Sequence, residues 1–208
     1  MSSSSESKTI SPITLKCLVI GHGSVGKTQY INRVGNSFTT NKGLVKIEYT
    51  ETILLPTDKK ELHKYHSFIV MSDSTSFTPF MYTDNILKTL HKEGLMKKVM
   101  LCNNKCDLIN ADKKRMTQAK VSEHTKENKE IALDLIVQKM FKEYPGLTYY
   151  DISAVSNYNI EKPTIFTIRS ALGEDSNFIS VSEDKNLYSL HPLPFTKRDR
   201  YSRYTSKR

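Results

Sequence analysis

The sequence has few cysteines and no long apolar run. Its three cysteines, Cys17, Cys102 and Cys106, are odd in number and are not spaced as metal ligands or as a disulfide framework. No apolar run approaches the roughly 20 residues of a membrane-spanning helix, and no signal peptide precedes the first apolar segment. Residue 2 is Ser and the last four residues are Thr-Ser-Lys-Arg, so neither end carries a lipidation motif. We therefore expect an intracellular protein of the cytoplasm, the nucleus or both, with no transmembrane segment and no lipid anchor.

Negative charge is scarce, above all near the end of the chain. The sequence has 31 Lys and Arg against 22 Asp and Glu, a formal charge of +9. Residues 197–208 contain six basic side chains and one acidic side chain, Asp199. Such a tail is either a solvated extension or a site for an anionic partner, such as nucleic acid, lipid headgroups or an acidic surface of an import receptor. The Ser-rich residues 1–12 are predicted to be a disordered N-terminal tail.

Apolar segments alternate with helical patterns along a chain whose 208 residues suit one domain. This alternation predicts an α/β fold, with right-handed crossovers, a mostly parallel sheet and helices on both faces. In such folds ligands bind at the carboxyl ends of the strands. We expect strands at about 14–20, 45–55, 67–72, 97–103 and 147–152, and helices at about 27–35, 77–93, 127–143 and 161–172.

The first motif is glycine-rich and directly follows the first expected strand. It reads Gly21-His22-Gly23-Ser24-Val25-Gly26-Lys27-Thr28 and precedes an amphipathic stretch. This is the pattern G-x-x-x-x-G-K-[ST], in which backbone N–H groups and a lysine surround phosphate groups. An ordinary strand-to-helix turn needs one glycine, not three followed by Lys-Thr. The motif therefore predicts a phosphate-binding loop.

A second motif, Asn104-Lys105-Cys106-Asp107, follows another expected strand. A carboxylate there can accept two hydrogen bonds from the N1–H and the exocyclic amine of guanine, which adenine cannot offer. Alone, such a string is usually a surface turn. After a strand and in this order, it indicates guanine binding. A third string, Asp151-Ile152-Ser153-Ala154, also begins at the end of an expected strand.

Residues 149–163 read Y-Y-D-I-S-A-V-S-N-Y-N-I-E-K-P. This segment closely resembles the Ran family (GTP-binding nuclear protein Ran) of the Ras-superfamily small GTPases. The chain is similar to that family over about residues 13–181, with gaps. The resemblance implies a three-layer P-loop NTPase fold with a G domain at 13–175 and GTP or GDP with Mg²⁺ as ligands. It also implies a setting in nucleocytoplasmic transport, with transport receptors or Ran-type regulators as partners.

For the phosphate side of the site, the resemblance assigns roles within residues 21–28. The backbone N–H groups of residues 23–27 would surround the β-phosphate, helped by the positive end of the following helix. Lys27 would hold the β- and γ-phosphates, and the Thr28 hydroxyl would ligate Mg²⁺.

For the base side, the resemblance gives Asp107 the selection of guanine. Asn104 would support the ring and its own loop, and the Lys105 stem would lie along the sugar and base. The segment Ser153, Ala154 and Val155 would face the base, with the Ala154 amide donating to the guanine O6. Phe38 matches an aromatic residue that packs edge-on against the base; the alternative is an ordinary core contact.

The parts of the family that respond to the third phosphate are missing. Small GTPases carry D-x-x-G-Q after the third strand, which supplies a Mg²⁺-side Asp, a γ-phosphate-sensing Gly and a water-orienting Gln. This chain has no glycine between Gly43 and Gly94, and its glutamines are Gln29, Gln118 and Gln138. We therefore expect a shortened second switch, a sheet of about five strands, no assigned catalytic residue, and hydrolysis that is slow or absent.

The first switch lacks a threonine in register for Mg²⁺, and Asp58 is a candidate for a remnant Mg²⁺-side carboxylate. An extra helical insert is expected at about 112–144, with Ile131, Leu135, Ile136 and Met140 packing inward. Residues 176–208 form a C-terminal extension whose basic end contrasts with the acidic tail of Ran. The leading interpretation is a Ran-like guanine-nucleotide-binding protein. The alternatives are a non-enzymatic pseudo-GTPase that acts as an interaction module, and a nucleic-acid-binding adaptor that uses the basic tail.

Overall fold

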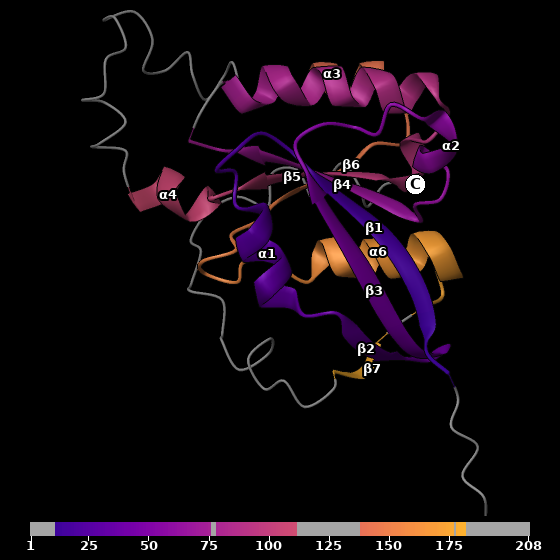
Figure 1. Ribbon diagram of the computed structural model, residues 1–208. Helices are drawn as coiled ribbons and strands as arrows, with labels where there is room; N and C mark the ends of the chain where they lie inside the picture. Colours follow the sequence, from indigo (N-terminus) through magenta and orange to yellow (C-terminus); the bar gives the residue numbers. More distant parts are fainter. Residues whose placement is uncertain (1–10, 76–77, 112–137, 177, 182–208) are drawn as a thin grey trace, which may run out of the picture.

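One seven-stranded sheet with the strand order β6-β5-β4-β1-β3-β2-β7 organises the computed structural model (Figure 1), which describes residues 11–75, 78–111, 138–176 and 178–181. The strands are β1 (Ile13–Ile20), β2 (Ser37–Thr40), β3 (Gly43–Thr52), β4 (Ser67–Asp73), β5 (Val99–Asn104), β6 (Thr148–Asp151) and β7 (Phe178–Val181). The α-helices are α1 (Lys27–Val34), α2 (Lys59–Leu62), α3 (Thr78–Lys92), α4 (Cys106–Ala111) and α6 (Lys162–Leu172). Residues 138–143 are also helical, and Met96–Lys98 form a 3₁₀ turn.

Five neighbouring strands, from β6 at one edge to β3, are parallel, as the alternating pattern predicts. β1 pairs in parallel with both β3 and β4, and β5 pairs in parallel with β4 and β6. β4 and β5 are buried along their whole length, because helices cover both faces, and continuous apolar runs are typical of such strands. The expectation of an α/β fold with a mostly parallel sheet is confirmed.

Helices cover the two faces of the sheet, so the protein has two cores. On one face, α2, α3 and residues 138–147 cover Leu18 and Ile20 of β1. On the other face, α1 and α6 cover Cys17 and Val19 of the same strand. Successive side chains of a strand point to opposite faces, and β1 is apolar at both sets of positions. Figure 1 shows α3 and α2 on one side of the sheet and α1 with α6 on the other.

The sheet has seven strands rather than about five, which corrects the expected count. A single strand was expected near 45–55, but a hairpin stands there: β2 is antiparallel to β3 and is joined to it by Asn41 and Lys42. β7 is antiparallel to β2 and forms the outer edge. It lies beyond residue 175, in the segment assigned to the C-terminal extension. Both missed strands have four residues, too few to show a clear period of two.

Several expectations concern other parts of the chain. The expected helix at 161–172 begins with Pro163 in its first turn and ends at Gly173, as predicted. Met140 of the expected insert is buried, whereas Ile131, Leu135 and Ile136 lie outside the described residues, as do residues 1–10 and the basic segment 197–208. Within the described ranges, no helix is long and apolar enough to cross a membrane.

Candidate ligand-binding site

The glycine loop, residues 21–26, connects β1 to α1 at the carboxyl edge of the sheet. A Cβ at Gly21 would lie 2.3 Å from the carbonyl oxygen of Met71 in β4. Gly26 has a φ of +94°, and a Cβ there would lie 2.4 Å from the side-chain Nδ2 of Asn104. A Cβ at Gly23 would meet nothing within 4 Å. Packing therefore requires two of the three glycines, while Gly23 leaves the outer side of the loop open.

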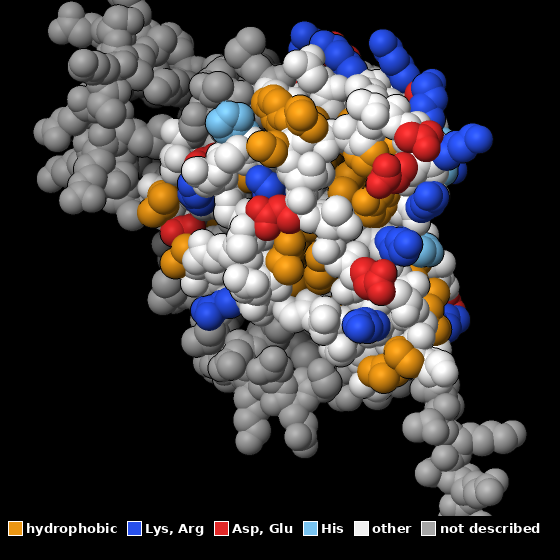
Figure 2. All heavy atoms as spheres, viewed as in Figure 1, with side chains coloured by type: hydrophobic (Ala, Val, Ile, Leu, Met, Phe, Trp, Pro, Cys, Tyr) orange, Lys and Arg blue, Asp and Glu red, His pale blue; other side chains and the backbone are white. Residues whose placement is uncertain are grey.

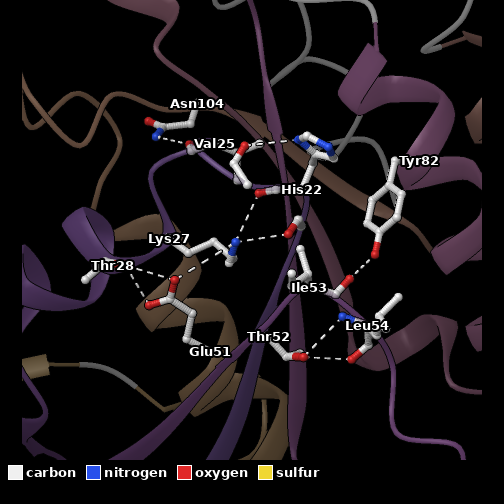
Figure 3. A network of polar contacts seen from close by, with 12 residues as sticks. His22, Val25, Lys27, Thr28, Glu51, Thr52, Ile53, Leu54, Tyr82 and Asn104 are labelled. Carbon is white, nitrogen blue, oxygen red and sulfur yellow. Dashed lines mark hydrogen bonds and ion pairs between the residues drawn. The ribbon is translucent and has the colours of Figure 1, made fainter.

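Lys27 folds its side chain back over this loop. Its Nζ donates to the carbonyl oxygens of Gly21 and His22, each at 3.0 Å, and its side chain is buried. Burial lowers the pKa of Lys27, and the nearby Glu51 carboxylate partly offsets that effect. The loop thus holds a buried ammonium group whose hydrogen-bond partners are neutral carbonyls (Figure 3).

Glu51 is the residue that the motif search missed. Both of its carboxylate oxygens lie 2.8 Å from Thr28 Oγ1, and Oε1 lies 4.0 Å from Lys27 Nζ. Glu51 is placed near the end of β3 on the same face as Ile47 and Tyr49, which is the face that α1 covers. The alternation of side chains along β3 is the sequence signal for this contact, because it places residue 51 on the face that the first turn of α1 covers.

Asp58, the earlier candidate for this carboxylate, has a different role. Its Oδ1 accepts a hydrogen bond from the backbone N–H of Lys60 at 2.9 Å and so caps the short helix α2. The carboxylate in contact with Thr28 is that of Glu51, and the assignment of Asp58 stays a prediction.

Asn104 joins the glycine loop to the segment after β6. Its Nδ2 donates to the Val25 carbonyl at 2.8 Å, and its Oδ1 accepts from the Ala154 N–H at 3.0 Å. Asn104 is 1% exposed, so both bonds are buried. Three strings that lie far apart in the sequence, at residues 21–28, 104–107 and 151–154, therefore meet at one edge of the sheet. Their convergence was expected; the double hydrogen bond of Asn104 was not.

Lys105 pairs with an acidic residue that sequence reasoning did not select. Its Nζ lies 2.7 Å from Asp73 Oδ2 at the end of β4, and Asp73 Oδ1 accepts from the N–H and the hydroxyl of Thr75. Desolvation alone would raise the pKa of Asp73, but the hydrogen bonds from Lys105 and Thr75 bring it below its ordinary value. The pair fixes the Lys105 side chain beside the loop that begins at Asn104.

Asp107 lies in the first turn of α4, and its Oδ1 is buried with no hydrogen-bond partner within the described part of the chain. Buried polar atoms are nearly always hydrogen-bonded, so this oxygen is an acceptor available to a ligand. Leu108, the next residue, and Val155, which follows Ala154, are exposed at 42% and 58%. Ser153, by contrast, is fully buried, and its Oγ accepts from the Ser156 N–H at 3.0 Å. Ser153 therefore shapes its own turn.

Left-handed backbone conformations concentrate in the same loops. Among the described residues, the non-glycine residues with positive φ are Ser24, Lys105, Asn157 and Asn159. Ser24 belongs to the glycine loop, Lys105 to the second motif, and the two asparagines follow the third. Such backbone strain is enriched at binding and catalytic sites.

Phe38 does not belong to the site, which corrects the expectation that it contacts a base. It is 1% exposed in the core beneath α1. The strand register pairs it with Val45, and Val45 with Ile13 at the start of β1. The glycine loop follows the opposite end of β1, about 23 Å away at the usual rise of a strand. Phe38 is a core residue.

No long segment covers the glycine loop within the described residues. The connection from α1 to β2 consists of Gly35 and Asn36 only. After Glu51 the chain continues as Thr52, Ile53 and Leu54, and the Thr52 carbonyl accepts from the Gly21 N–H at 3.4 Å. These positions supply neither glycine nor glutamine.

The segment after β3 is held in place and carries exposed apolar side chains. The Tyr82 hydroxyl donates to the Ile53 carbonyl, and Thr52 Oγ1 bonds both the N–H and the carbonyl of Leu54 (Figure 3). Ile53 and Leu54 are 53% and 70% exposed. Figure 2 shows hydrophobic side chains interspersed with Lys, Arg, Asp and Glu on this side of the molecule.

Among the described residues, no group of three or more His, Cys, Asp or Glu could hold a metal ion on its own. A scan against protein-family models finds no match for this chain.

Proposed function

We propose that the chain binds guanine nucleotides, GTP or GDP with Mg²⁺, and hydrolyses GTP slowly or not at all. The observation that carries this proposal is the double hydrogen bond of Asn104, which joins the glycine loop to the segment at Ala154. Lys27 follows the first of these joined loops, and Asp107 lies three residues after Asn104. The strand order and the place of the glycine loop also support the three-layer P-loop NTPase fold of small GTPases.

The glycine loop suits phosphate groups. An ammonium ion donates three hydrogen bonds, and Lys27 uses two of them on loop carbonyls. The N-terminus of α1, an eight-residue helix, contributes its positive dipole end. A phosphate would give the buried Lys27 charge the anionic partner that neutral carbonyls do not provide.

The loop after β5, which contains Asp107, suits guanine. Asp107 Oδ1 is a buried acceptor without a donor in the described part of the chain, and guanine offers two adjacent N–H donors. The exposed side chains of Leu108 and Val155 can contact the faces of a planar ring. The Ala154 N–H would exchange its bond to Asn104 for one to the guanine O6, because one amide hydrogen makes one strong bond.

Thr28 and Glu51 suit a divalent cation. A hydroxyl and a carboxylate are the hard oxygen ligands that Mg²⁺ prefers, and Mg²⁺ usually binds protein through one or two such groups while phosphates and water complete its shell. When bound, the cation neutralises phosphate charge. Thr28 Oγ1 and the Glu51 carboxylate already lie in contact.

Hydrolysis needs a group that orients the attacking water. The residues after Glu51 are Thr52, Ile53 and Leu54, and the last two are exposed hydrocarbons. The site therefore favours binding over catalysis. By its resemblance to the Ran family, we place this binding in nucleocytoplasmic transport, with transport receptors or Ran-type regulators as partners.

A pseudo-GTPase interaction module is the second candidate. The two-residue connection between α1 and β2 favours it, because a connection this short leaves no segment there that could change its conformation with the phosphate state of a ligand.

The test is calorimetric titration of the purified full-length chain with GDP, GTP and ATP, with and without Mg²⁺. We expect GDP and GTP to bind with Mg²⁺ and ATP to bind at least about 10⁴-fold more weakly, the scale on which a site built to hydrogen-bond a substrate N–H rejects an analogue that lacks it. Lys27→Ala should abolish binding, and Lys46→Ala, which removes an exposed lysine on β3, should not. Absence of GDP binding to the wild type would contradict the proposal and favour the interaction module.

A further inference from the structure

The Glu51 carboxylate occupies the end of the glycine loop where Lys27 and Thr28 lie. It contacts Thr28 Oγ1 at 2.8 Å through either oxygen and lies 4.0 Å from Lys27 Nζ. Figure 3 shows the three side chains converging from β3 and α1. Within the described residues, Lys27 makes one ion pair, and its partner is Glu51. The anionic partner of the loop lysine is thus a side chain of the protein itself.

Lys27 needs such a partner. Its side chain is 7% exposed, and a buried charge is costly without an opposite charge. The carbonyls of Gly21 and His22 supply hydrogen bonds but no negative charge. Glu51 supplies that charge together with an acceptor for the Thr28 hydroxyl. A bound phosphate with its cation would provide the negative charge for Lys27 and the contact for Thr28 at the same place.

The Glu51 side chain can leave while its backbone stays. Residue 51 is paired in register with Val19 of β1, so the strand fixes its Cα. The Glu51 side chain is 36% exposed, and a glutamate side chain can rotate into solvent without any movement of the sheet. Release of the loop therefore needs a rotamer change and no loop opening.

We propose that Glu51 is a tethered anion that occupies the phosphate end of the glycine loop in the ligand-free protein and competes with phosphate for Lys27 and Thr28. The inference rests on the proposed function. Phosphate and carboxylate carry like charges, so their proximity without a cation is unfavourable. A divalent cation between them reverses the sign of this interaction. Glu51 therefore opposes the nucleotide in the absence of Mg²⁺ and supports it in the presence of Mg²⁺.

The test measures binding of GDP, and of inorganic pyrophosphate as a probe without a base, in Mg²⁺ and in EDTA. The proteins are the wild type, Glu51→Gln, and Glu48→Gln, which makes the same charge change at an exposed position of the same strand. In EDTA we expect Glu51→Gln to bind both probes about tenfold more tightly than the wild type, as removal of one like charge in a partly exposed site implies. In Mg²⁺ this gain should vanish or reverse. Glu48→Gln should match the wild type in both buffers.

The outcomes separate the inference from the function. Equal affinities of wild type and Glu51→Gln in EDTA, with normal GDP binding, would overturn the tethered-anion inference and leave the proposed function standing. Failure of the wild type to bind either probe in Mg²⁺ would overturn both. The thermal midpoint of the ligand-free proteins adds a readout without nucleotide: Glu51→Gln should melt below Glu48→Gln, because the buried Lys27 charge loses its counter-ion. Equal midpoints would also count against the inference.

Discussion

The side-chain amide of Asn104 donates to the Val25 carbonyl at 2.8 Å, across 79 residues of sequence. The other end of the same side chain accepts from the Ala154 N–H at 3.0 Å. Asn104 therefore sets the distance between the glycine loop and the loop after β6. Gly26 belongs to the same arrangement, since a Cβ there would collide with the Asn104 amide. The proposed ligand site would thus be assembled from three connections of the sheet.

Asn104→Ala should lower the free energy of unfolding by about 2 kcal/mol, because the Val25 carbonyl and the Ala154 N–H would both lose a buried partner. Urea denaturation followed by circular dichroism measures this change. Asn85→Ala, on the exposed side of α3, is the control and should change stability by less than about 0.5 kcal/mol. Equal stability of the two variants would contradict a bridging role for Asn104.

Asp107→Asn should shift base preference from guanine toward xanthine. The amide can donate to the carbonyl that xanthine has in place of the guanine amine, whereas a carboxylate cannot. Competition between GDP and xanthosine diphosphate measures the preference. Asp58→Asn is the control, because asparagine caps a helix as well as aspartate does. An unchanged preference for GDP in the Asp107 variant would show that this carboxylate does not contact the base.

GTP hydrolysis by the preloaded protein should proceed at or below about 10⁻⁴ per second, the intrinsic rate of small GTPases that have the water-orienting glutamine. The segment after Glu51 offers Thr52, Ile53 and Leu54 where such a group would be needed. A Ran-type activating protein should not accelerate the reaction. Single-turnover phosphate release is the measurement. A rate near one per second would mean that another residue, such as Glu61 or His63 in the connection before β4, orients the water.

The ion pair between Lys105 and Asp73 should make stability depend on pH in the acidic range. The pKa of Asp73 is lower in the folded protein than its ordinary value of 3.8. Its contribution is therefore complete above that value and is lost as the pH falls through the lower, folded-state pKa. Asp73→Asn should cost about 1 kcal/mol at pH 7 and less at pH 3. A cost that does not change between the two pH values would show that the pair contributes no charge-dependent stability.

Which parts of this structure can be predicted from the sequence depends on how many residues carry each pattern. The apolar runs of β1, β4 and β5 identify central strands, and the eight-residue glycine motif fixes where β1 ends. The four residues of β2 or β7 contain too few positions for a period to be visible. The prediction that Phe38 contacts a base is wrong for the same reason. Without β2, no pattern assigns residue 38 to the end of the sheet opposite the glycine loop.

Glu51 and Asp73 show a different limit. Both are carboxylates at the carboxyl ends of strands, and neither is part of a sequence motif that predicts its role. Glu51 has no downstream glycine, and Asp73 follows no named motif. Their contacts with Thr28 and Lys105 come from strand register, which brings together residues 23 and 32 positions apart. A single sequence carries no direct record of that register.

The place of β7 has a consequence for how the chain is made. β2 pairs on its outer side with Phe178–Val181, so its N–H and C=O groups on that side have no strand partner until the ribosome has released residue 181. Until then, a nascent chain with β1 to β6 already folded would present β2 as an open edge, which is a template for pairing with another chain. We expect synthesis that stops between residues 173 and 177 to yield a protein that has all residues of the proposed ligand site and still aggregates through Ser37–Thr40.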